Sequence, residues 1–378
     1  MEQLSGGFLL CPSKPGAGKH NLAKTPPIET LCVTLEWTIK QVMECVNANT
    51  CGIAIVVDAD RRLVSTVTDG DLRRAILQGL NLSLPIQELI NRKEAGPATQ
   101  PITAPVSTDR GKLLGMMRRY VVRHIPLLDS EKKVVGLARL EDLVDEPLPI
   151  QAVVMAGGFG KRLLPLTEST PKPLLPIGDK PLLERLVEQL RDSQIKHINI
   201  STHFLGDQIK ERLGDGRQWG VDINYLSEKN PLGTAGSLGL MNRPKEPVLI
   251  VNGDILTRLD FHSMLLFHND NKAVMTVAVK QFGVKIPYGV VETKGIEIQG
   301  LIEKPTTPFF VVAGVYLASP EVWEIISKGK RCDMPDLIQR LIKKGKKVIS
   351  FPVSEYWVDI GKLEDYEGAQ ADVSSGNF

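Results

Sequence analysis

The feature that most constrains the fold is an apolar segment, residues 150–155, that runs directly into a glycine-rich turn. The segment reads IQAVVM and the turn that follows it reads AGGFGKRL. A buried strand that ends in such a turn can bring backbone N–H groups against a phosphate, because glycine permits positive φ and close approach. Arg162 adds a planar guanidinium for the same phosphates. The segment therefore predicts an α/β domain that binds a phosphate-bearing ligand.

Two common phosphate motifs do not fit the chain. The dinucleotide pattern G-x-G-x-x-G fails because Leu163 stands where the third glycine belongs. Residues 16–19 (GAGK) hint at a P-loop, but Ser13 replaces its first glycine and His20 replaces its Ser or Thr. Neither a Rossmann dinucleotide site nor a Walker site is expected.

The turn is the start of a longer motif. With LPLT at 164–167 and PKPLLPI at 171–177, the chain completes G-G-x-G-x-R-L-x-P-L-T-x(3)-P-K-P. This resembles the signature of the sugar nucleotidyltransferases, and the resemblance extends to about residue 370. It implies triphosphate cations at Arg162 and Lys172 and further nucleotide contacts at Ala156, Gly157, Gly158, Gly160 and Lys161. Lys161 departs from the family, which usually has Thr or Ser there.

The segments that follow alternate in character. Residues 181–192 are helix-like and apolar on one side, and strand-like, helix-like and strand-like segments follow at 195–201, 206–213 and 221–226. Such alternation predicts a mostly parallel sheet flanked by helices. We expect a Rossmann-like nucleotidyltransferase domain over residues 150–372.

Residues 228–236 (EKNPLGTAG) resemble the base-reading loop of the same family. The resemblance implies nucleotide contacts at Glu228, Gly233 and Thr234. A carboxylate at Glu228 can accept from the adjacent N1–H and N2–H₂ of guanine, whereas uracil and thymine would oppose it with two carbonyls. Glu228 therefore favours GTP. A uridylyl-, thymidylyl- or cytidylyltransferase stays open, as does a surface role for Glu228 with the base held by backbone.

Two distant carboxylates complete the expected catalytic set. Asp254 ends the apolar segment VLIVNGD, and Asp359 lies in WVDIG. The family resemblance implies that both hold Mg²⁺, which takes one or two carboxylates together with substrate phosphates. With Arg162, Lys172 and Lys304 they would neutralise charge while a sugar phosphate oxygen attacks the α-phosphorus.

The sugar side is less well specified. Residues 302–305 (IEKP) match the family's sugar-phosphate motif, so Lys304 would face the sugar phosphate and Glu303 would accept from sugar hydroxyls. Tyr288 and Gly289 match a segment that approaches the sugar. Ala313 stands where many relatives have Asn, which leaves the sugar undetermined. From a different class, the chain could be a catalytically silent protein that senses nucleotides.

Upstream, residues 30–146 contain a duplication. VVDADRRLV at 56–64 matches LLDSEKKVV at 127–135, with Asp58 and Asp129 separated by 71 residues (129 − 58). Each copy reads helix, strand, turn, strand, helix, the first with helices at 35–48 and 71–78 and strands at 52–57 and 63–67.

This duplication resembles a tandem pair of CBS domains, which implies a regulatory adenine-nucleotide site. Asp71 could accept from both ribose hydroxyls and Thr68 could bond ribose or phosphate, although Asp71 could also be a simple helix cap. The second copy has Arg139 where Thr is expected, and Ser65 replaces the usual glycine in the first. One adenosine site is therefore expected, or a purely structural pair.

The composition narrows the range of binding partners and compartments that we expect. The 46 Lys and Arg against 44 Asp and Glu give a net charge of +2, so nucleic acid and anionic membranes are not expected partners. Five cysteines without a C-x-x-C pair are typical of a reducing compartment. We expect a cytoplasmic homo-oligomer with a flexible leader at residues 1–29.

Overall fold

The computed structural model describes residues 26–49, 51–93, 100–143, 148 and 150–378. Most of the predicted leader, and residues 145–147 and 149 of the segment that follows the duplication, lie outside these described residues. The described end of the leader forms part of a 3-10 helix, η1 (Ile28–Leu31), and Leu31 is buried. Ordered structure is therefore already present before the predicted boundary at residue 30.

The N-terminal region consists of two copies of one unit, as the duplication predicts. The first copy contains β1 (Cys32–Val33), α1 (Ile39–Asn49), β2 (Ile53–Val57), β3 (Leu63–Thr68), α2 (Asp69–Leu77) and α3 (Ile86–Asn91). The second contains β4 (Ala104–Pro105), α4 (Arg110–Tyr120), β5 (His124–Leu128), β6 (Val134–Arg139) and α5 (Leu140–Leu143). Strand β5 begins 71 residues after β2 (124 − 53), and β6 begins 71 residues after β3 (134 − 63).

The two copies cover each other. Each has a three-stranded sheet in which the first two strands are parallel and the last two antiparallel. Ile53 and Ile55 of β2 pack in one buried cluster with Val134 and Leu137 of β6. Burial of apolar surface between the copies is what holds the pair together. Each copy thus covers part of the apolar surface of the other.

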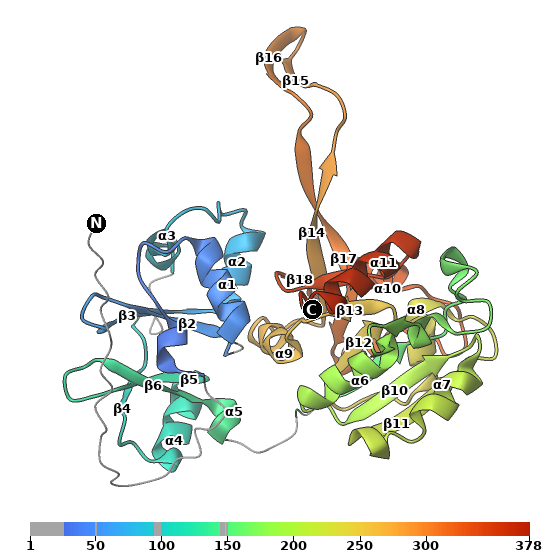
Figure 1. Ribbon diagram of the computed structural model, residues 1–378, viewed down its shortest axis with the longest axis horizontal. Coiled ribbons are helices and arrows are strands. Elements are labelled where there is room, and N and C mark those ends of the chain that lie inside the picture. The colour runs from blue at the N-terminus through green and yellow to red at the C-terminus, as the bar shows by residue number, and fades with distance from the viewer. Residues whose placement is uncertain (1–25, 50, 94–99, 144–147, 149) are drawn as a thin grey trace, which may run out of the picture.

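The C-terminal region is built on a seven-stranded mixed sheet (Figure 1). Its strands in spatial order are β11 (Asp222–Ser227), β10 (His197–Thr202), β7 (Gln151–Met155), β12 (Val248–Asn252), β17 (Thr306–Ala318), β14 (Met275–Lys285) and β18 (Val348–Pro352). Four neighbouring pairs are parallel, and β17 is antiparallel to both of its neighbours. The mostly parallel sheet is therefore confirmed.

Helices cover both faces of this sheet. One face carries α6 (Leu182–Asp192), α7 (Gly206–Leu213) and α9 (Phe261–Asp270), and the other carries α8 (Gly233–Gly236) and α10 (Met334–Lys343). Along β7, Ala152 and Val154 pack in the first core and Val153 packs in the second, as side-chain alternation in a strand requires. Within the described residues, no helix combines the length and apolarity needed to cross a membrane.

Two features extend the sheet. A short ribbon pairs β13 (Ile255–Thr257) with β19 (Trp357–Asp359), and α11 (Leu363–Ser374) follows it. Strands β14 and β17 also continue together past the sheet as a two-stranded arm, tipped by the hairpin of β15 (Val290–Lys294) and β16 (Glu297–Ile302). Figure 1 shows the arm projecting away from the rest of the molecule. The sequence patterns did not indicate this arm.

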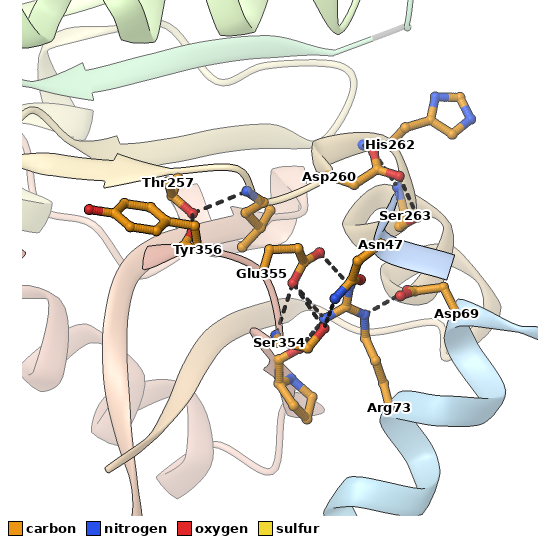
Figure 2. A network of polar contacts seen from close by, with 12 residues as sticks. Asn47, Asp69, Arg73, Thr257, Asp260, His262, Ser263, Ser354, Glu355 and Tyr356 are labelled. Carbon is orange, nitrogen blue, oxygen red and sulfur yellow. Dashed lines mark hydrogen bonds and ion pairs between the residues drawn. The ribbon is translucent and has the colours of Figure 1, made fainter. Parts of the chain in front are cut away.

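The two regions meet at a buried guanidinium. Arg73 of α2 is fully buried and bonds Asp69 on its own helix (2.6 Å) and Glu355 in the loop before β19 (2.7 Å), as Figure 2 shows. The guanidinium also donates to the carbonyl of Pro352 and lies 3.8 Å from the ring centre of Phe351. Burial opposes its charge, but Asp69 and Glu355 raise the pKa of Arg73 above its ordinary value. Arg73 also lowers the pKa of Glu355, so these two groups stay charged.

A second contact lies nearby. Arg123 of the N-terminal pair bonds the ring of His262 at the start of α9. Burial and the Arg123 charge lower the pKa of His262 to about 4, so the imidazole is neutral near pH 7 and can accept this bond. Asn47 of α1 also donates to Ser354 (3.4 Å). Helices α1, α2 and the second repeat thus all contact the C-terminal region.

Arg73→Met is expected to destabilise the protein by about 3–5 kcal/mol, because it leaves Glu355 buried without its cation. Arg61→Ala is a matched control, since it breaks an exposed pair with Glu29, and such pairs contribute roughly 0–1 kcal/mol. Urea denaturation followed by tryptophan fluorescence would measure both. Equal shifts for the two variants would contradict the structural role of Arg73.

Candidate functional site

The glycine-rich loop leaves β7 at the carboxyl end of the parallel strands, where open α/β sheets bind ligands. The first residue of the loop is held in place by a backbone hydrogen bond: the N–H of Ala156 donates to the carbonyl of Ser201 (2.9 Å). Gly160 has φ +63°, and a Cβ there would lie 2.8 Å from Cγ2 of Thr167. Thr167 in turn donates to the carbonyl of Gly160 (2.8 Å). The turn is therefore closely packed on its own loop and requires glycine.

The next residues of the loop are more open. Gly158 is exposed, and a Cβ there would meet no heavy atom within 4 Å. Lys161 and Arg162 are also exposed, with the Lys161 ammonium 5.7 Å from the ring centre of Phe159. Open backbone beside two cations is suited to an anionic ligand.

Glu228 lies beside this loop, as a base-reading residue would. A Cβ on Gly157 would be 3.2 Å from its Oε1. Its carboxylate already accepts from the hydroxyl of Ser201 (2.5 Å) and from the N–H of Leu232 (2.8 Å). The side chain is thus fixed in orientation by its own loop.

Thr234 and Gly233 lie further along the same loop, but their contacts are with the residues at the start of α10. The hydroxyl of Thr234 accepts from the N–H of Met334 (2.8 Å), and its N–H donates to Asp333 (3.3 Å). Gly233 has φ +79°, and a Cβ there would meet the carbonyl of Cys332 at 2.7 Å. In this structure both residues fix the loop against the start of α10.

Asp254 and Asp359 come together through the β13–β19 ribbon. Ile255 pairs with Asp359 across the ribbon, and the N–H of Ile360 donates to the carbonyl of Asp254 (3.0 Å). The carboxylate of Asp254 also accepts from the ammonium of Lys172 (2.5 Å), which is buried. Three of the predicted residues are therefore neighbours, although they come from distant parts of the chain.

The Asp359 carboxylate lies in an unfavourable electrostatic environment. Burial and the neighbouring Asp254 raise the pKa of Asp359, against the opposing effect of Lys172 and Arg162. Two neighbouring carboxylates that repel each other are stabilised by a bound cation.

The donor set fits a hard divalent cation. The Oδ1 atom of Asn252 is buried and has no hydrogen-bond partner among the described residues, two positions from Asp254. Across the described part of the chain, no cluster of three or more His, Cys, Asp or Glu could hold a metal alone. A cation between Asp254 and Asp359 would therefore need phosphate or water oxygens as further ligands, as Mg²⁺ commonly takes.

The predicted sugar-phosphate residues lie elsewhere, on the arm. Tyr288, Gly289, Glu303 and Lys304 are all exposed, and Tyr288 keeps 74% of its surface. They are close to one another, since a Cβ on Gly289 would be 3.0 Å from Oε2 of Glu303. Lys304 has φ +47°, an uncommon conformation for a residue with a side chain. The structure groups these four residues but does not bring them to Asp254.

In the N-terminal pair, Thr68 and Asp71 form a capping box on α2. Thr68 accepts from the N–H of Asp71, and Asp71 accepts from the N–H of Thr68. Burial opposes ionisation of Asp71, but Lys93, the Thr68 N–H and Arg74 together lower its pKa. In the second copy, Arg139 bonds both oxygens of Asp142 (2.6 and 2.7 Å). The helix-cap interpretation of Asp71 is therefore realised in this structure.

A cavity of about 830 Å³ opens between the two regions. From the N-terminal pair it is lined by Thr66, Thr68, Gly70 and Arg74, among others, and from the C-terminal region by residues of α6 and α9 and by Glu355. Thr68 thus borders the cavity, whereas Asp71 is absent from its lining in the described part of the chain. An exposed cation and a threonine hydroxyl at its wall are suited to a phosphate.

Several residues of these sites were missed from the sequence. Ser201 and Asn252 are polar residues at strand ends, a visible signal that was not used. Asp365, which accepts from the N–H groups of Gly361 and Lys362 (3.1 and 2.9 Å), could have been found as a helix-start carboxylate. Glu355 gave no such signal, because its partner Arg73 is remote in the sequence.

Comparison with known proteins matches these regions to two families. A nucleotidyl transferase family model covers residues 151–376, and a CBS domain model covers residues 21–78 and 93–148. The chain is 30% identical over 234 residues to the mannose-1-phosphate guanylyltransferase of Mycobacterium tuberculosis, covering 60% of this chain and 65% of that protein. It therefore spans less than two thirds of this relative.

Two other relatives have different named substrates. The D-glycero-α-D-manno-heptose 1-phosphate guanylyltransferase of Aneurinibacillus thermoaerophilus is 31% identical over 228 residues, which is 59% of this chain and 98% of that protein. The UTP–glucose-1-phosphate uridylyltransferase of a Synechocystis species is 31% identical over 238 residues, covering 57% of this chain and 61% of that protein.

Gly160→Ala is expected to lower stability by about 2 kcal/mol or more, because a positive φ costs roughly 1–2 kcal/mol and the added Cβ also meets Thr167. Gly345→Ala is the matched control, since it has φ +68° but no atom within 4 Å of the new Cβ. It should show the backbone cost alone. Urea midpoints would report both, and an equal loss would refute close packing at the loop.

Proposed function

The chain belongs to the nucleotidyl transferase family, whose model matches more than half of it, and on that premise we propose that it transfers a nucleoside monophosphate from a nucleoside triphosphate to a sugar 1-phosphate. The observation that carries the proposal is the grouping of Lys172, Asp254 and Asp359 at the end of the sheet, next to the glycine-rich loop. A nucleotidyl transfer needs these parts: a backbone cradle, a cation and two carboxylates.

The chemistry requires no general base. A phosphate oxygen of the sugar 1-phosphate, already an anion, forms a bond to the α-phosphorus, while the bond to the β-phosphate oxygen breaks and pyrophosphate departs. Arg162 and the open backbone near Gly158 would bind the triphosphate, and Lys172 would hold Asp254 in position and add positive charge. Positioning and neutralisation are the main contributions such a site makes.

Mg²⁺ is the proposed cofactor, held by Asp254 and Asp359 with phosphate oxygens completing its shell. When bound, it would neutralise the phosphates and orient the departing pyrophosphate. The raised pKa of Asp359 and the unpaired Oδ1 of Asn252 support a cation at this place.

GTP is the proposed donor. Glu228 is held beside Gly157 by bonds to Ser201 and Leu232, so its remaining lone pairs are fixed in direction and could accept from guanine. Guanylyltransferases among the relatives agree with this choice, and the uridylyltransferase keeps UTP as the second candidate.

A silent nucleotide sensor is the alternative from a different class. The Lys172–Asp254 ion pair and the adjacent Asp359 argue against it. Placing two carboxylates close together is electrostatically unfavourable, and a protein that only bound nucleotides would not need such a pair.

The test is pyrophosphate release with GTP, UTP, CTP, ATP and dTTP against a panel of sugar 1-phosphates in Mg²⁺. We expect release with GTP at the highest rate, and a loss of about 100-fold or more in Asp254→Asn, as for other groups that stabilise charge in the transition state. Asp336→Asn, on the exposed side of α10, is the control and should retain activity. Absence of release with every pair would refute the proposal.

We further propose that the cavity between the regions binds an adenine nucleotide that regulates the enzyme. Thr68 and Arg74 border it and could contact ribose and phosphate. Glu355 borders the same cavity, bonds Arg73 and lies four residues before Asp359. A ligand in the cavity could therefore alter the position of Asp359, a proposed metal-binding carboxylate. Asp71 would act through the α2 cap and not by direct contact.

Calorimetric titration with AMP, ADP and ATP tests this site. Arg74→Gln should weaken binding roughly 10- to 100-fold, the range for a lost charge-assisted hydrogen bond. Arg92→Gln removes another exposed cation, one that does not line the cavity, and this variant should bind the nucleotide normally. No heat with any of the three nucleotides, or the same loss in both variants, would contradict the assignment.

A further inference from the structure

The arm is a long two-stranded ribbon that projects from the sheet. Strands β14 and β17 stay in register from Val279 and Val312 out to Lys285 and Thr306, and the β15–β16 hairpin extends beyond them. In Figure 1 this arm stands clear of both regions of the molecule. A two-stranded ribbon alone in water is at best marginally stable. A partner that packs against it would supply the missing stabilisation.

The surface of the arm also indicates a partner. Its exposed large apolar residues are Phe282, Val284, Tyr288, Val291, Ile296, Ile298, Leu301, Ile302, Phe309, Phe310 and Val312. Ile296 at the tip is fully exposed and Leu301 keeps 63% of its surface. Large apolar side chains left exposed in such number on one element indicate an interaction site.

The same arm carries the residues proposed for the sugar phosphate. Lys304 lies ten residues before Gly314 (314 − 304), and a Cβ on Gly314 would be 2.9 Å from the amide nitrogen of Asn252. At roughly 3.3 Å per residue, Lys304 is about 30 Å along the strand from the Asp254 end of its own sheet. An extended arm therefore keeps Lys304 and Glu303 away from the carboxylates of the same chain.

We propose that the arm of one copy docks on a second copy of this chain and places Lys304 and Glu303 beside the partner's nucleotide and Mg²⁺ site, with the partner's arm doing the same in return. The inference rests on the proposed function. A reciprocal exchange is the isologous arrangement of a two-fold dimer, so it closes without leaving a free arm. Each active site would then be built from two chains.

The rim of the receiving site suits such an arm. Leu164 and Leu166, on the loop that joins Gly160 to Lys172, are exposed. Phe159 in the glycine-rich loop and Leu363 at the start of α11, four residues after Asp359, are exposed as well. These apolar residues could cover the apolar surface of the arm. The positive charge of Lys304 would meet the carboxylates of Asp254 and Asp359 and the phosphates bound there.

A mixed-dimer experiment separates exchange from a self-contained site. Asp254→Asn and Lys304→Ala chains, each with a different affinity tag, are co-expressed and the doubly tagged dimers are purified. Each variant alone should be nearly inactive in pyrophosphate release. With exchange, the mixed dimer has one intact site, from the body of one chain and the arm of the other, and should show about half the wild-type activity per dimer. With self-contained sites it should show none.

The reverse combination is the matched control. A chain carrying both substitutions, paired with wild type, should be inactive under exchange, because each site contains one lesion. Under self-contained sites it should keep about half the activity. Asp359→Asn can replace Asp254→Asn if loss of the Lys172 partner impairs folding. Ala at position 304 has the same backbone cost as Lys at φ +47°, so the arm itself should be unchanged.

Sedimentation supplies a readout independent of catalysis. Wild type should sediment as a dimer or larger, and Leu301→Glu on the arm should shift it toward monomer. Ile342→Glu, an exposed apolar residue on α10, should not. A monomeric wild type, full activity in Lys304→Ala, or an inactive mixed dimer would each overturn the exchange. Absence of pyrophosphate release from wild type, with dimerisation still lost in Leu301→Glu, would refute the proposed function but leave arm docking in place.

Discussion

The β13–β19 ribbon is the constraint on which the rest of the C-terminal region depends. It joins the loop after β12 to a segment about a hundred residues later, so that Asp254 and Asp359 lie at one end of the sheet. Because the ribbon is short, its register is held by its surroundings: Thr257 donates to the carbonyl of Tyr356, and the Trp357 indole donates to the carbonyl of Ala313. The glycine-rich loop and the Lys172 ammonium are arranged around this point.

Much of this could be predicted from the sequence, because local patterns report local structure. The duplication, the amphipathic helix at 182–192 and the strand before the glycine-rich turn all have spacings that only one kind of element explains. The N-terminal end of α2 was placed two residues late, at Asp71, because Thr68 is its N-cap and Asp71 is the third residue of the helix. The family motif supplied the identities of Lys172, Asp254 and Asp359, and the structure brings these three together.

What could not be predicted depends on contacts between remote segments. Arg73 reads as one more charge on a polar helix face, and only the docked loop with Phe351 and Glu355 reveals that it is fully buried. The arm was missed for a similar reason. The alternating apolar residues at 281–285 and the apolar run at 309–312 look like any strand of a sheet. Nothing in these segments shows that no further strand or helix covers them.

The position of Arg73 has a consequence for how such proteins diversify. The N-terminal pair looks like a detachable module, yet its guanidinium ends among Pro352, Phe351 and Glu355 of the other region. A gene fusion that acquired the pair would have gained little from it until the loop at 351–355 had matched the guanidinium. Loss of the pair would remove the cation that Glu355 binds and the guanidinium that lies over the ring of Phe351. The contact that Arg73 makes falls on one loop, and that loop leads to Asp359.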